Sequence, residues 1–131
     1  MAWGADLSGQ VKAATGEPIP ARLLILNPAT RASVVLYTDP QGNFKSEVPD
    51  GALRLVATHG PEWTIAECEA RGGDRLDLVL TRLVDMPARG YYGADLHMHS
   101  TFSDGRQSPA EVAFHCQVEG LHIAALTDHE N

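Results

Sequence analysis

The sequence contains only two cysteines in 131 residues, Cys68 and Cys116. We expect them to belong to different structural units, so a disulfide between them is not expected. Reduced thiols fit a reducing compartment. Residues 1–10 also lack the basic start and apolar run of a secretory signal. These absences predict a cytoplasmic protein.

Long hydrophobic runs and an excess of positive charge are missing as well. No apolar stretch reaches the roughly 18 residues that a membrane-spanning helix needs. The chain has 10 Lys and Arg against 17 Asp and Glu, which gives a formal net charge of −7. Such a chain is not expected to bind nucleic acid or an anionic membrane through charge alone. A bound metal ion would reverse the local field, so a small anionic substrate remains compatible with the charge.

Residues 1–85 contain short apolar or alternating patterns separated by turn residues. Strands are expected at residues 7–12, 21–26, 33–38, 44–48, 53–57, 63–66 and 76–80. Leu53, Leu55 and Ala57, for example, alternate with Arg54 and Val56, and this period of two places one set on a buried face. Short strands with frequent turns predict a mostly β chain whose first unit is an antiparallel β-sandwich.

Residues 86–92 have a different character, because Pro87 and Gly90 lie on either side of Arg89. Proline and glycine near charged residues are typical of domain boundaries. We therefore predict a sandwich domain at residues 1–85, a linker at 86–92 and a second unit at 93–131.

Two histidines separated by one residue, His97 and His99, end the apolar stretch that starts the second unit. On a strand they point to the same side, while Met98 points to the other. Imidazole nitrogen suits zinc, manganese, iron or nickel. Asp104 follows in a Ser-Asp-Gly turn that can direct its carboxylate back to the histidines.

A helix is expected next, because Ser108 and Glu111 have the spacing of a capping box and Gly120 marks the end. Residues 121–126 then form an apolar run broken only by His122 near its start, which is typical of a parallel strand buried on both faces. A strand, a helix and a parallel strand bring both carboxyl ends to one edge, where His129 would join the earlier histidines.

The motif from Asp95 to Gly105, followed by Thr127-Asp128-His129, resembles the first two motifs of the PHP-domain metallohydrolases. The branch it resembles includes enzymes that hydrolyse carbaryl and other carbamates. Turn motifs at residues 16–21, 38–44 and 49–53 resemble the carboxypeptidase regulatory-like, transthyretin-like sandwich. The resemblance implies that residues 93–131 are the first βαβ unit of a truncated (β/α)7 barrel, which holds two or three divalent metal ions such as Zn, Mn or Fe.

The resemblance also implies a role for each motif residue. His97 and His99 would bind one metal ion, and Asp104 and His129 would bind a neighbouring one. Asp95 and Asp128 would orient the imidazoles rather than bind metal. No catalytic group beyond the metal ligands is implied.

The implied activity is hydrolysis of a phosphoester or a carbamate or ester bond by metal-activated water. The family's later ligands are absent, so this chain alone is expected to be inactive. Residues 93–131 would need the rest of a barrel or another chain to complete the site. One alternative is a non-catalytic β-sandwich interaction module with a vestigial metal motif. Another is a single structural metal site. The presence of all four ligand residues favours the hydrolase.

Overall fold

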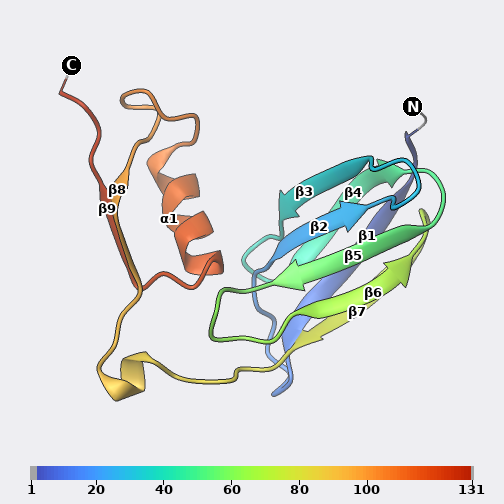
Figure 1. The fold of residues 1–131 in the computed structure, drawn as a ribbon, viewed down its shortest axis with the longest axis horizontal. Helices are drawn as coiled ribbons and strands as arrows, with labels where there is room; N and C mark the ends of the chain where they lie inside the picture. The colour runs from blue at the N-terminus through green and yellow to red at the C-terminus, as the bar shows by residue number, and fades with distance from the viewer. Residues whose placement is uncertain (1–2, 131) are drawn as a thin grey trace.

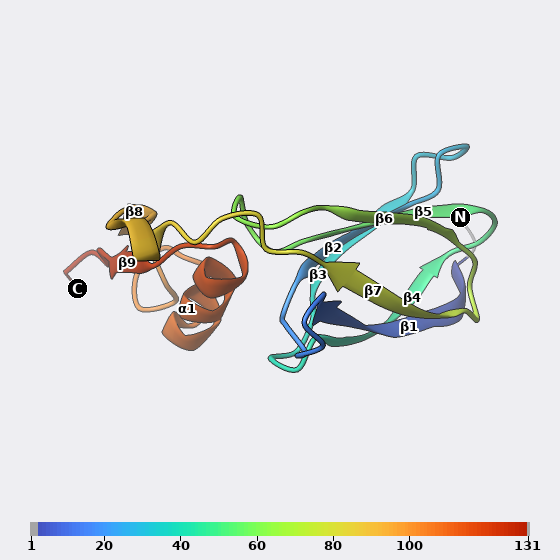
Figure 2. The same ribbon diagram turned by 90° about the horizontal axis from the view of Figure 1, so that it is seen from below.

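The computed structural model describes residues 3–130, which are mostly β-strand with one α-helix among them. The first seven strands are β1 (Trp3–Ala13), β2 (Arg22–Leu26), β3 (Ser33–Tyr37), β4 (Asn43–Pro49), β5 (Leu53–Thr58), β6 (Ala66–Ala70) and β7 (Arg75–Leu80). They form a three-stranded sheet in the order β4-β1-β7 and a four-stranded sheet in the order β3-β2-β5-β6. Figure 2 shows the two sheets as stacked layers, so the predicted β-sandwich is confirmed.

The apolar residues of the alternating strands form the core between the two sheets. Leu7 and Val11 on β1, and Leu55 on β5, have no exposed surface. Burying one such side chain stabilises the fold by roughly 1.5–3 kcal/mol. The buried cluster consists of Leu7, Val11, Ala13, Ile19, Ala21, Leu23, Ile25, Phe44, Val48, Leu53, Leu55, Ala57, Ala70, Leu78 and Leu80.

Two details of the sandwich differ from the prediction. β1 pairs antiparallel with β4 but parallel with β7, so the first sheet is mixed. The expected strand at 63–66 is wrong, because Trp63 forms only an isolated bridge to Arg82 and the strand begins at Ala66. β6 carries two glutamates and has a weak strand propensity. Its pairing with β5, where Cys68 lies opposite Leu55, determines its position.

After a short 3-10 helix, η1 (Pro87–Arg89), the chain forms β8 (Ala94–Met98), α1 (Pro109–Val118) and β9 (Ile123–Leu126). β8 and β9 pair in parallel, and no barrel is seen within residues 3–130. The predicted capping box is confirmed, because the Ser108 and Glu111 side chains bond to each other's backbone N–H groups.

The expected burial of the second parallel strand on both faces is wrong. On that strand, β9, Ile123 and Leu126 are 49% and 42% exposed, and Leu96 on the neighbouring β8 is 67% exposed. The reason is that α1 covers one face of the β8–β9 sheet, where it buries Val112 and Cys116, and the other face has no covering element among the described residues.

Figure 1 shows α1 between the β8–β9 sheet and the sandwich. The Tyr37 ring at the end of β3 stacks on His115 of α1, with ring centroids 3.8 Å apart, and the Tyr37 hydroxyl donates a hydrogen bond to Glu119 at 2.9 Å. Gly60 and Gly120 approach so closely that a Cβ atom on Gly60 would lie 2.6 Å from the carbonyl oxygen of Glu119. The sandwich and the 93–130 segment therefore touch through specific contacts.

The domain boundaries remain predictions. In the structure β7 ends at Leu80 and β8 begins at Ala94, with η1 between them. Within residues 3–130, no helix has both the length and the apolar character needed to cross a bilayer.

Candidate functional site

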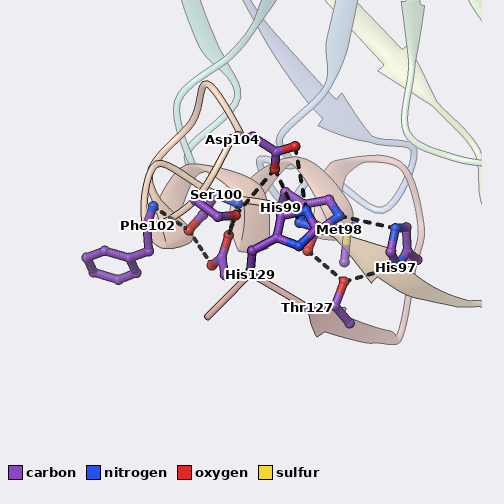
Figure 3. Close-up of polar contacts among 10 residues, drawn as sticks. His97, Met98, His99, Ser100, Phe102, Asp104, Thr127 and His129 are labelled. Carbon is purple, nitrogen blue, oxygen red and sulfur yellow. Dashed lines mark hydrogen bonds and ion pairs between the residues drawn. The ribbon is translucent and has the colours of Figure 1, made fainter. Parts of the chain in front are cut away.

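Met98, the residue between the two histidines, packs on the face of β8 that α1 covers. Met98 faces α1, where its Sδ atom lies 3.3 Å from the Cys116 Sγ atom. His97 lies near the carboxyl end of β8, and His99 follows the strand directly and lines a pocket together with Val112 and His115 of α1. Their Nε2 atoms are 3.1 Å apart and their rings meet edge to face (Figure 3).

The loop after β8 brings Asp104 back to this pair, as its turn sequence predicts. One carboxylate oxygen of Asp104 lies 3.4 Å from His99 Nδ1, and the other lies 3.7 Å from His129 Nε2. The His129 ring stacks on the His99 ring with centroids 4.7 Å apart. Figure 3 shows these side chains converging from β8, the loop and the segment after β9.

Asp128 anchors that loop. Its carboxylate accepts hydrogen bonds from the Ser100 backbone N–H and the Ser100 hydroxyl, both at 2.6 Å, and from the Ser103 hydroxyl at 2.7 Å. These bonds, those of Ser100 and Ser103 foremost, hold the pKa of Asp128 below its usual range. The carboxylate thus ties the loop that carries Asp104 to the end of β9.

The other predicted orienting residue acts on the backbone. Asp95 accepts a hydrogen bond from the backbone N–H of His97 at 3.1 Å, so it holds the main chain of β8. Sequence reasoning missed Thr127, whose hydroxyl lies 3.2 Å from His97 Nδ1. Thr127 lies directly after the second strand and before Asp128, and this position could have indicated a role beside the histidines.

The geometry fits a divalent metal ion. Two imidazole nitrogens bound at 2.0–2.1 Å to one tetrahedral ion lie roughly 3.3 Å apart, close to the separation of the two Nε2 atoms. His99 Nδ1 is buried and lacks a hydrogen-bond partner, because its contact with Asp104 does not have hydrogen-bond geometry. His99, Asp104 and His129 can each offer a ligand atom, with all three atoms within 4.8 Å of one another. His97 is outside this group of three, because it approaches His99 at Nε2 whereas Asp104 lies near Nδ1. Imidazole and carboxylate ligands suit Zn, Mn or Fe.

The site is open to solvent. The side chains of Asp104 and His129 are 68% and 64% exposed, whereas that of His99 is 20% exposed. Two other histidines of this segment lie outside the cluster. His115 is on α1, and His122 accepts a hydrogen bond at Nδ1 from the Gly93 backbone, with its Nε2 atom 3.7 Å from Glu62.

Comparison with known proteins gives short matches. No family model matches the chain. A DNA polymerase/3'-5' exonuclease PolX from Bacillus subtilis is 44% identical over 46 residues, which are 35% of this chain and 8% of that protein. A 5'-3' exoribonuclease from Haemophilus influenzae is 47% identical over 36 residues, which are 28% of this chain and 13% of that protein. The chain therefore spans a small part of the curated relatives it matches.

Among solved structures, a DUF3823 family protein from Parabacteroides merdae is similar, with 17% identity and a TM-score of 0.48. The match covers 60% of this chain and 46% of that one. The predicted assignment to the PHP metallohydrolases with a carboxypeptidase regulatory-like sandwich is wrong, because no family model matches the chain. The motifs behind the assignment were short, and turns rich in Gly, Pro, Asn and Asp reflect local turn chemistry that many β proteins share.

Proposed function

We propose that His97, His99, Asp104 and His129 bind divalent metal ions, and that the protein to which this site belongs is a metal-dependent hydrolase. The observation that carries the proposal is that His99, Asp104 and His129 offer ligand atoms within 4.8 Å of one another at the carboxyl end of a parallel strand pair, with His97 Nε2 3.1 Å from His99 Nε2. Three separate segments contribute to the cluster. Because these segments are separate in the sequence, their convergence favours a binding site rather than a chance grouping of surface residues.

The bond most consistent with this site is a phosphoester. Both curated relatives carry names of nucleases, which cleave phosphodiester bonds. Bound metal ions would lower the pKa of a coordinated water and polarise the phosphoryl oxygen. The net charge of −7 disfavours a long polyanion, so we propose a small phosphodiester as the substrate. A carbamate or ester remains the second substrate class, with no observation in its favour.

The protein's own groups have distinct tasks in this proposal. His97 and His99 hold one side of the site, and Asp104 with His129 holds the other. Asp128 keeps the Asp104 loop in place through its bonds to Ser100. The exposure of Asp104 and His129 leaves room for the substrate to approach from solvent.

Metal content per chain tests the proposal. Purified protein, passed through gel filtration without added metal, is analysed for Zn, Mn and Fe. We expect at least about one equivalent per chain, lost in His97→Ala and in His129→Ala. The control is Asp77→Ala, because Asp77 is an exposed residue on β7 outside the cluster. A metal-free wild type, or equal loss in the control, would contradict the proposal.

Hydrolysis is tested separately with bis(p-nitrophenyl) phosphate and p-nitrophenyl acetate. Asp104→Asn is expected to lower phosphodiester cleavage by about 100-fold or more. Cleavage of the acetate but not the phosphodiester would instead favour the ester class.

A further inference from the structure

Thr127 bonds to two groups of β8 at once. Its hydroxyl lies 3.2 Å from His97 Nδ1 and 3.2 Å from the carbonyl oxygen of Met98. Its backbone N–H also donates to the same carbonyl at 2.7 Å. The backbone bond fixes the position of Thr127, so the hydroxyl meets the His97 ring in a defined orientation (Figure 3).

The number of protons on these groups determines the direction of each bond. A threonine hydroxyl has one proton, and a carbonyl oxygen only accepts. The hydroxyl therefore donates to Met98 and accepts from His97, which requires a hydrogen on Nδ1 of His97. With the hydrogen on Nε2 instead, the hydroxyl would donate to Nδ1 and its oxygen would face the Met98 carbonyl with no hydrogen between them.

We propose that Thr127 is a positioning residue that fixes His97 in the Nδ1–H tautomer. A neutral imidazole then carries its free lone pair on Nε2. That atom is the one that lies 3.1 Å from His99 Nε2. A histidine that binds metal through one nitrogen usually donates the other N–H to a fixed acceptor, and here the Thr127 hydroxyl is that acceptor. The consequence for metal binding rests on the proposed function, whereas the tautomer itself does not.

The tautomer can be read from the imidazole ¹⁵N resonances of the metal-free protein at a pH where His97 is neutral. We expect Nδ1 of His97 to be protonated and Nε2 unprotonated in the wild type. Thr127→Val keeps the shape of the side chain but removes the acceptor, so we expect the Nε2–H tautomer to increase. Thr127→Ser retains the hydroxyl and is expected to restore the wild-type pattern.

A second measurement follows Zn²⁺ affinity in the same three proteins. Loss of a group that orients a metal-binding histidine lowers affinity by about 10- to 100-fold. We expect this loss in Thr127→Val and not in Thr127→Ser. A wild-type His97 with its hydrogen on Nε2, or an unchanged tautomer in Thr127→Val, would overturn the inference. If the wild type binds no metal while His97 keeps its hydrogen on Nδ1, the proposed function fails and the role of Thr127 in fixing the tautomer stands.

Discussion

The contact between Tyr37 and α1 offers a direct test of how the sandwich and the 93–130 segment are joined. Tyr37→Phe removes the hydrogen bond to Glu119, which is worth about 0.5–1.5 kcal/mol. Tyr37→Ala also removes the stacking on His115, worth about 0.5–1.5 kcal/mol more. The full truncation is therefore expected to weaken the docking of α1 by roughly 1–3 kcal/mol.

Hydrogen exchange measures this change locally. If α1 opens when it undocks, its backbone amides should exchange roughly 5- to 150-fold faster in Tyr37→Ala, and less so in Tyr37→Phe. Amides of β1 in the sandwich serve as the internal reference. Tyr91→Ala is the matched control, because Tyr91 is 65% exposed. Unchanged exchange in α1 of Tyr37→Ala would show that this contact does not hold the two parts together.

Other predictions concern the core, the helix cap and pH. Leu55→Ala should lower the free energy of unfolding by about 2–5 kcal/mol in urea denaturation, whereas Val79→Ala, at a 55% exposed position, should change it far less. Ser108→Ala should lower the helicity of α1 by circular dichroism, and Ser108→Asp, which keeps a cap, should not. Burial lowers the pKa of His59, so its contribution to stability is present above the ordinary pKa of about 6.5 and is lost as the pH falls through the lower folded value. His59→Gln should therefore flatten this acid-side loss, measured as the midpoint of thermal unfolding against pH.

The sandwich could be predicted because its information is local. Alternation at Leu53 and Leu55 marks a half-buried strand, and the turn residues between strands mark their ends. The position of β6 could not be predicted, because its pairing with β5 outweighs the weak strand propensity of Glu67 and Glu69. The parallel pairing of β1 with β7 joins strands that are far apart in the sequence, so the local pattern of residues does not predict it.

The convergence of the candidate ligands was also expected from the sequence, since His97 and His99 end one strand and His129 follows its parallel neighbour. The hydrogen bonds made by the neighbouring residues Thr127 and Asp128 were not predicted from the sequence. Thr127 contacts the His97 ring and Asp128 holds the loop, and both roles depend on side-chain geometry after the strands have paired. The exposure of the β8–β9 sheet was missed because an apolar run indicates what can be buried and does not show what covers it.

Calorimetric titration of the chelator-treated protein with Zn²⁺ measures directly whether the cluster binds metal. The wild type is compared with Asp104→Asn and with Asp77→Asn, an exposed aspartate on β7. We expect saturable binding that weakens by about 10-fold or more in Asp104→Asn and is unchanged in Asp77→Asn. Equal affinity in all three proteins, or no binding to the wild type, would show that the cluster is not a metal site.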